Sequence, residues 1–186
     1  MDEISRRTFV ADVAKAGAAF TIVPRHVLGG PGYRAPSDTL NVACVGVGGM
    51  GTSDVNGVSG ENIVAMCDVD DRRAETTYAR FPAARKYRDF RQMLEREGKG
   101  IDAVTVSTPD HTHTVIAMAA MRMGKHVYVQ KPLARTIHEV RTLMDGARRH
   151  KVATQMGNQG HAGPGTRNLR EWIEAGAIGT VREIHY

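Results

Sequence analysis

The chain has 186 residues, of which 41% are hydrophobic and 24% charged, so it can hold one globular domain and part of a second. The formal net charge is +5, but residues 1–35 hold an excess of two positive charges and the remaining charges are mixed rather than in blocks. This distribution is weak evidence for nucleic-acid binding, and we expect no nucleic-acid partner.

Residues 1–35 are predicted to form an export signal and a linker rather than part of the fold. The letters SRRTF at residues 5–9 resemble a twin-arginine signal, and a mildly apolar stretch follows at residues 10–23. That stretch is too short for a stable membrane span, and Lys15 interrupts it. The alternative is an amphipathic helix with two surface arginines. On the first interpretation the twin-arginine machinery exports the protein to the periplasm, and whether the signal is cleaved is left open.

Beyond the linker, short apolar runs alternate with helix-forming segments. Strands are predicted at residues 40–46, 61–68, 101–109, 126–132 and 151–156. Helices are predicted at residues 49–60, 71–81, 89–97, 112–125 and 136–150, with Asp89 and Thr136 at two of the helix starts. Such alternation is typical of a parallel sheet wrapped by helices, so we expect a doubly wound α/β fold of the Rossmann type over residues 36–156. Cys44 and Cys67 fall in two of the strands and are expected to be reduced core thiols.

The first predicted strand ends in Gly-Val-Gly-Gly-Met-Gly at residues 46–51, which fits the pattern G-x-G-x-x-G. Asp68 follows 22 positions after Gly46, close to the spacing of about 20 in dinucleotide-binding units. In such a unit Gly46 permits the turn, Gly48 lets the backbone approach a pyrophosphate, and Gly51 lets the helix pack against the strand. Asp68 would accept hydrogen bonds from ribose hydroxyls. The alternatives are a purely structural turn and the similar loop of methyltransferases that bind S-adenosylmethionine.

The ends of the later strands meet at the edge of a parallel sheet where ligands bind. Residues 107–109 would fix the chain beside the second half of a dinucleotide, and Lys131, held by Pro132, would reach its ring end. The alternative for Lys131 is an ordinary surface lysine. The alternative for His111 and His113 is that they are two polar residues at the start of a helix. A metal site at these histidines is a poor fit, because positions two apart point in different directions on a helix, and no metal is expected.

Five segments in this order resemble the glucose–fructose oxidoreductase and inositol dehydrogenase family, also called Gfo/Idh/MocA: GVGGMG, CDVD, STPDHTH, GKHVYVQKPL and GNQGH. The resemblance covers residues 40–186 and favours a nicotinamide cofactor over S-adenosylmethionine. The family's Glu-Lys-Pro signature stands here as Gln130-Lys131-Pro132, so a charge beside the lysine is lost. The resemblance implies that Lys131 contributes to catalysis and to nicotinamide placement, and His113 matches the histidine after the family's Thr-Pro motif.

The resemblance implies an exported NAD(P)-dependent oxidoreductase that transfers a hydride between nicotinamide and a sugar, polyol or related hydroxyl compound. NAD is favoured over NADP, because Asp68 would repel a 2′-phosphate, although Arg72 and Arg73 would offset part of that repulsion. The predicted catalytic residue is Lys131. The predicted cofactor-binding residues are Gly46, Val47, Gly48, Gly49, Met50, Gly51, Asp68, Ser107, Thr108, Pro109, His111, His113, Gln130, Lys131, Pro132, Asn158 and Gln159.

Members of the family are longer, and their second domain adds an open sheet, much of the sugar site and further catalytic groups. Residues 157–186 are predicted to hold a junction helix at 164–176 and, at 179–186, the first strand of a truncated second α+β domain. We therefore expect a fragment of a longer enzyme, and leave open whether the fragment is active and whether the parent is a homo-oligomer. The alternative is a non-catalytic dinucleotide-binding remnant or sensor.

Overall fold

The computed structural model describes residues 34–185. The predicted export signal, within residues 1–33, lies outside the described residues. The chain divides into two units, residues 1–39 and residues 40–186, and each is described by itself. The described part of the first unit holds a short 3₁₀ helix, η1 (Pro36–Asp38). In the part of the chain that the structure describes, no helix has the length and apolar character needed to cross a membrane.

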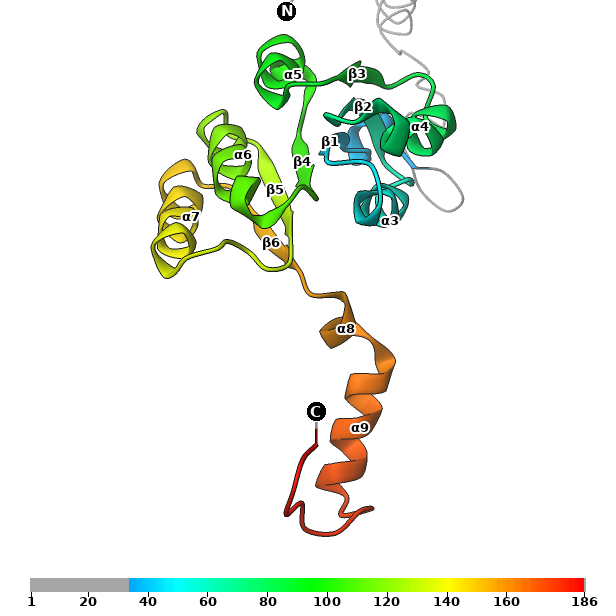
Figure 1. Ribbon diagram of the computed structural model, residues 1–186, viewed down its shortest axis with the longest axis vertical. Coiled ribbons are helices and arrows are strands. Elements are labelled where there is room, and N and C mark those ends of the chain that lie inside the picture. The colour runs from blue at the N-terminus through cyan, green and yellow to red at the C-terminus, as the bar shows by residue number, and fades with distance from the viewer. Residues whose placement is uncertain (1–33, 186) are drawn as a thin grey trace, which may run out of the picture. The chain divides into compact units, whose positions relative to one another are not determined.

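In the second unit, six parallel strands form one sheet in the order β3-β2-β1-β4-β5-β6 (Figure 1). The strands are β1 (Asn41–Val45), β2 (Asn62–Cys67), β3 (Arg85–Tyr87), β4 (Ala103–Val106), β5 (His126–Gln130) and β6 (Thr154–Gly157). The strand order reverses beside β1, so the carboxyl ends of β1 and β4 border a crevice of the kind that binds ligands in doubly wound folds. The predicted doubly wound parallel sheet is confirmed. The prediction missed β3, whose three residues have no apolar run and pair only with β2.

Helices connect these strands and cover both faces of the sheet. They are α3 (Met50–Gly57), α4 (Asp71–Arg80), α5 (Phe90–Glu97), the 3₁₀ helix η2 (Gly98–Gly100), α6 (Asp110–Arg122) and α7 (Ile137–His150). Two further helices, α8 (Gln159–Ala162) and α9 (Pro164–Glu174), follow the last strand. Asp89 caps α5 by accepting a hydrogen bond from the Arg91 N–H at 2.9 Å. Thr136 and Glu139 each accept from the other's backbone N–H at the start of α7, which is a capping box. Both predicted helix starts are thus confirmed.

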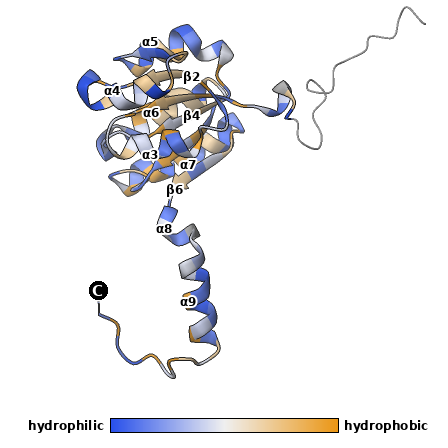
Figure 2. Cartoon of the chain, turned by 90° about the vertical axis from the view of Figure 1, so that its right-hand side faces the viewer, coloured by the Kyte–Doolittle hydropathy of each residue, from blue (hydrophilic) through white to orange (hydrophobic). Residues whose placement is uncertain are grey.

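Buried apolar side chains form one cluster on each face of the sheet. Along β1, Val42 and Cys44 join the cluster under α3 and α4, whereas Ala43 and Val45 join the cluster under α5, α6 and α7. This alternation arises because successive side chains of a strand point to opposite faces. Figure 2 shows hydrophobic residues gathered in the central strands and hydrophilic residues over the outer surface of the helices. The two clusters therefore fix the sheet between two helical layers.

The two cysteines lie on opposite faces of the sheet, since Cys44 belongs to one cluster and Cys67 to the other. Both are buried free thiols, which confirms the expectation from the sequence. Burial raises the pKa of Cys44 to about 11. Burial, together with the nearby Asp68 and Asp89 carboxylates, raises the pKa of Cys67 to about 12. Both thiols therefore stay protonated at neutral pH.

The segment after the sheet agrees only in part with the prediction. Helix α9 forms within residues 164–176, where a helix was predicted, and none of its residues is buried, whereas its place at a domain junction stays a prediction. Residues 179–185 form no strand here, so the first strand of a second sheet, expected at residues 179–186, also stays a prediction. A strand needs hydrogen-bond partners on a neighbouring strand, and all six strands of the described residues lie in the one parallel sheet. The structure groups residues 157–186 with the sheet in one unit. That these residues begin a separate domain stays a prediction.

Candidate functional site

The turn after β1 brings three backbone segments into close contact. Gly46 has a φ of +78°, and a Cβ there would lie 2.7 Å from backbone atoms of Ser107 and Thr108 after β4. A Cβ at Gly51 would lie only 1.7 Å from the Gly46 carbonyl oxygen. Gly46 thus makes the turn and Gly51 lets α3 start against it, as expected from the sequence.

The next two glycines lie against the first turn of α4. A Cβ at Gly48 would be 3.0 Å from both the Cβ and the carbonyl oxygen of Arg73. Gly49 has a φ of +59°, and a Cβ there would be 3.1 Å from the Arg73 guanidinium. The packing of α4 therefore gives Gly48 a reason to lack a side chain that sequence reasoning missed. Its approach to a pyrophosphate stays a prediction.

Asp68, just after β2, holds the glycine loop with its carboxylate. Its Oδ2 accepts hydrogen bonds from the N–H groups of Val47 and Gly48, both at 2.9 Å. Its Oδ1 accepts from the Asp70 N–H at 3.0 Å. The sequence predicted that Asp68 binds ribose hydroxyls, but it did not predict that Asp68 also holds the glycine loop. Because a carboxylate has about four acceptor sites, Oδ1 keeps capacity for a ribose hydroxyl.

A cavity of about 380 Å³ opens at the carboxyl ends of β1, β2 and β4. It gathers five of the predicted residues, namely Gly46, Asp68, Thr108, Pro109 and His111. Arg88, Phe90 and Arg91 also line it, and sequence reasoning missed them because it missed β3, the strand that they follow. This volume is within the range of about 300–1,000 Å³ for small-molecule pockets. The cavity is therefore large enough for a small-molecule group, and Asp68 lies in its wall.

A second group of polar side chains meets around Asp54 of α3, which sequence reasoning also missed. The Asp54 carboxylate accepts a hydrogen bond from the Ser107 hydroxyl at 2.6 Å and two from the Gln130 amide at 3.0 and 3.2 Å. The Gln159 amide donates to the same carboxylate at 3.3 Å and to the Tyr128 hydroxyl at 3.0 Å. Burial, followed by the Asp54 charge, raises the pKa of Tyr128. Three predicted site residues are thus joined through an acid that the prediction did not contain.

The turn after β5 carries the predicted catalytic lysine. Lys131 and Pro132 are both exposed, with a cis peptide bond between them, and the Lys131 N–H donates to the Gln130 side-chain oxygen at 2.6 Å. His113 bonds through Nδ1 to the Pro132 carbonyl at 2.9 Å and through Nε2 to the Thr108 carbonyl at 2.7 Å. His113 therefore joins the turns after β4 and β5 from inside the protein.

The remaining predicted residues differ in how open they are to a ligand. Gln130 and His113 are only 5% and 1% exposed, and protein groups engage their polar atoms. Val47 is fully buried, so it offers only its backbone. Met50 at the start of α3 and Asn158 before α8 are exposed. Contact between each of these residues and a cofactor stays a prediction.

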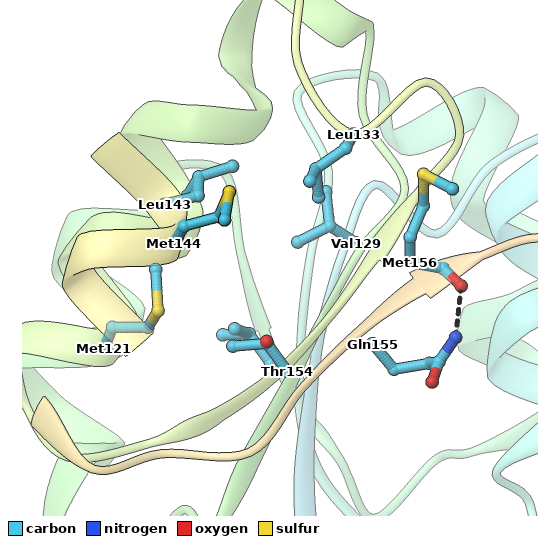
Figure 3. Close-up of a pocket in the computed structure, with 9 residues that line it drawn as sticks. Met121, Val129, Leu133, Leu143, Met144, Thr154, Gln155 and Met156 are labelled. Carbon is cyan, nitrogen blue, oxygen red and sulfur yellow. Dashed lines mark hydrogen bonds between the residues drawn. The ribbon is translucent and has the colours of Figure 1, made fainter. Parts of the chain in front are cut away.

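A small pocket lies elsewhere in the second unit. It has a volume of about 90 Å³ and lies among α6, α7, β5 and β6, and mostly apolar side chains line it (Figure 3). Its Gln155 donates to the Met156 carbonyl at 2.8 Å, and the volume is too small for a dinucleotide. Among residues 34–185, no three or more His, Cys, Asp and Glu side chains gather as a metal ion would need. The glycine loop therefore remains the candidate site.

Residues 40–158 match a family model, GFO_IDH_MocA, described as "Oxidoreductase family, NAD-binding Rossmann fold". Inositol 2-dehydrogenase from Salmonella typhimurium is 28% identical over 153 residues, which cover 79% of this chain and 45% of that protein. A glycosyl hydrolase family 109 protein from Saccharopolyspora erythraea is 35% identical over 159 residues, which cover 77% of this chain and 34% of that protein. The chain thus spans about half the length, or less, of the curated relatives that it matches.

Solved structures share the same fold. The crystal structure of myo-inositol 2-dehydrogenase from Lactobacillus plantarum aligns with a TM-score of 0.67 and 25% identity. The alignment covers 77% of this chain and 43% of that one. The part that aligns is therefore most of this chain and less than half of the enzyme.

Proposed function

Because the chain belongs to the Gfo/Idh/MocA oxidoreductase family, with its NAD-binding Rossmann fold, we propose that it binds NAD for hydride transfer to or from a sugar, polyol or related hydroxyl compound. The observation that carries the proposal is the Asp68 carboxylate, which bonds to the glycine loop beside a cavity at the carboxyl ends of the strands. The name of the Salmonella relative, inositol 2-dehydrogenase, supports a polyol as the substrate class.

The residues present fit a dinucleotide. The loop at Gly46–Gly51 contains four glycines, so no side chain of these residues would keep a ligand from its backbone, and no side chain caps the start of α3 at Gly49. The N–H groups and the positive end of the helix dipole there would stabilise a pyrophosphate. Asp68 would accept a hydrogen bond from the adenosine ribose, and His111 lies in the same cavity wall. NAD is the proposed cofactor, since a 2′-phosphate would bring negative charge against Asp68.

Lys131 is the proposed acid–base residue. NAD, when bound, supplies the nicotinamide that accepts a hydride from the carbon bearing the substrate hydroxyl. Lys131 is exposed after β5, at the same edge of the sheet as the glycine loop. Its side-chain nitrogen would take the hydroxyl proton during oxidation and return it during reduction. A positioned group of this kind contributes roughly 10²–10⁴-fold to the rate.

Export to the periplasm is part of the same proposal. Its support is the sequence alone: Arg6 and Arg7 precede a short, mildly apolar stretch near the start of the chain. Twin-arginine transport carries folded proteins, so the cofactor would be loaded before export. The signal would therefore fit an enzyme that needs a cytoplasmic nucleotide.

A second candidate function is glycoside hydrolysis. The relative named glycosyl hydrolase family 109 protein is 35% identical to this chain, compared with 28% for the inositol 2-dehydrogenase. Net reduction of NAD distinguishes the two functions. A dehydrogenase accumulates NADH from a polyol, whereas a hydrolase releases p-nitrophenol from p-nitrophenyl glycosides without accumulating NADH.

Titration calorimetry tests the cofactor, and turnover tests the reaction. The 186-residue chain should bind NAD with a saturable signal and should not bind S-adenosylmethionine. The natural protein that contains these residues should then form NADH on addition of inositol or another polyol. Tighter binding of S-adenosylmethionine than of NAD would overturn the proposal. Binding of NAD without turnover on any polyol, sugar or glycoside would favour the non-catalytic alternative.

A further inference from the structure

The proposed chemistry gives no role to Asp54, a partly buried carboxylate beside the glycine loop. Asp54 lies on α3, the helix that starts at the glycine loop. It accepts hydrogen bonds from Ser107 after β4, from Gln130 at the end of β5 and from Gln159 after β6. One acid thus joins the helix of the cofactor loop to the ends of three neighbouring strands.

The contact with Gln130 leads directly to the lysine turn. The Gln130 amide nitrogen lies 3.0 and 3.2 Å from the two Asp54 oxygens, so it donates to the carboxylate. The Gln130 side-chain oxygen is then fixed on the other side, where it accepts the Lys131 N–H at 2.6 Å. Because Gln130 is only 5% exposed, water competes little for these bonds. Asp54 therefore determines which way the Gln130 amide faces, and the amide holds the backbone of Lys131.

The same geometry explains the departure from the Glu-Lys-Pro signature. A glutamate at position 130 would place a carboxylate oxygen where the amide nitrogen stands, about 3 Å from the Asp54 oxygens. Two carboxylates at that distance, one buried and one partly buried, cannot both ionise without a cost. A glutamine removes the repulsion and supplies a donor. In this chain the carboxylate near the lysine turn is therefore Asp54 on α3, and not a glutamate at position 130 of β5.

We propose that Asp54 is a positioning residue, which orients the Lys131 turn through the Gln130 amide. This inference rests on the proposed function, because the orientation matters for proton transfer by Lys131. The role requires an acceptor on one of the two side chains and a donor on the other. The two groups can be exchanged between the positions, and that exchange makes the inference testable.

The kinetic test exchanges the two groups. Gln130→Glu alone brings two carboxylates together, and a misplacement of about 1 Å would lower kcat by about 10²-fold. The loss should be smaller at lower pH, where one of the two carboxylates takes up a proton. Asp54→Asn combined with Gln130→Glu restores one donor and one acceptor, with the hydrogen bond reversed. We expect kcat of the double variant to exceed that of Gln130→Glu by about tenfold or more.

A spectroscopic test does not depend on activity. The ¹⁵N–¹H signal of the Lys131 amide in the 186-residue chain reports the bond to Gln130. It should move in Asp54→Ala, which removes the acceptor of the Gln130 amide, and in Gln130→Glu. It should return toward the wild-type position in the variant that combines Asp54→Asn with Gln130→Glu. Glu75→Gln, an exposed change on α4, is the matched control and should leave the signal in place. Ser107→Ala, which removes the hydroxyl that braces Asp54, serves as the perturbation if Asp54→Ala does not fold.

The outcomes separate this inference from the proposed function. A wild-type chain without NAD binding or turnover would defeat the proposed function, while the Lys131 amide signal would still decide the role of Asp54. An amide signal that Asp54→Ala leaves unchanged would overturn the positioning role. A double variant that is no more active than Gln130→Glu in a protein that turns over would overturn it as well.

Discussion

Gly51 lies so close to Gly46 that a Cβ on Gly51 would stand 1.7 Å from the Gly46 carbonyl oxygen. No side-chain rotation relieves such a contact, because both atoms are fixed by the backbone. The start of α3 and the end of β1 can therefore keep this geometry only with glycine at position 51. The same geometry aims the first turn of α3 at the proposed pyrophosphate position.

Gly51→Ala is expected to weaken NAD binding and to destabilise the fold. The added methyl group must displace α3 or the loop, and overpacking of this kind costs about 1–3 kcal/mol of unfolding free energy. Gly57→Ala is the matched control, since it lies in the same helix and its Cβ would have open space. Urea unfolding and calorimetric titration with NAD measure the two effects. A Gly51→Ala chain as stable and as tightly binding as Gly57→Ala would show that the contact has been misjudged.

The choice between NAD and NADP is expected to depend on Asp68. In the wild-type chain a 2′-phosphate would meet a carboxylate that is already bonded to the loop, so NAD should bind more tightly. Asp68→Ser removes the charge and leaves Arg72 and Arg73, so the ratio of the two dissociation constants should shift toward NADP. Two charges about 4 Å apart interact by roughly 1–4 kcal/mol in a partly exposed site.

The control for this experiment is Asp145→Ser, which removes an exposed carboxylate of α7 that lies 3.4 Å from the Arg148 guanidinium. It changes the net charge by the same amount without touching the glycine loop. Calorimetric titration with both cofactors gives the ratio for each chain. Tighter binding of NADP by the wild-type chain would contradict the role given to Asp68.

The strands, the glycine loop and two helix caps were predictable because their signals are local. An apolar run, a run of glycines, or a capping residue such as Asp89 or Thr136 lies within the element that it marks. The strand expected at residues 179–186 stays a prediction for the opposite reason. Its residues suit a strand, but a strand forms only beside another strand, and local composition does not reveal whether one is present.

Asp54 could not be found from local patterns. Its partners Ser107, Gln130 and Gln159 are 53, 76 and 105 positions away in the chain. Only the parallel sheet brings them together, by placing the ends of β4, β5 and β6 at one edge. The replacement of the signature glutamate by Gln130 was visible in the sequence, but its reason required the position of Asp54.

The stability of the fold is expected to fall at alkaline pH because of the two buried thiols. A free thiol has a pKa of 9.0, whereas the pKa in the fold is about 11 for Cys44 and about 12 for Cys67. Since the folded pKa is the higher one, the stabilisation is complete below pH 9.0 and is lost as the pH rises toward the folded values. Urea unfolding on either side of that pH should show a smaller decrease for Cys44→Ala than for the wild type. Equal decreases would mean that the thiol does not ionise on unfolding.

Export is expected to require both arginines of the predicted signal. Lysine keeps the charge but not the planar donor geometry of the guanidinium, so Arg6→Lys with Arg7→Lys should retain the protein in the cytoplasm. Arg25→Lys, which lies outside the pair, is the control. Cell fractionation with immunodetection measures the periplasmic share. A periplasmic share of the double variant equal to that of the wild type would contradict the export proposal.

Lys131→Ala is expected to lower kcat without a comparable change in NAD affinity. The side chain is exposed after β5, and its backbone is held by the Gln130 oxygen, so removal of the amine should leave the turn in place. The loss of acid–base help should lower kcat by roughly 10²–10⁴-fold. The measurement is steady-state turnover of the natural protein with a polyol, together with calorimetric titration of NAD. Lys99→Ala, an exposed lysine in η2, controls for the loss of a surface charge. A Lys131→Ala protein with normal kcat would show that Lys131 is an ordinary surface lysine after a strand. Another group would then have to accept the hydroxyl proton.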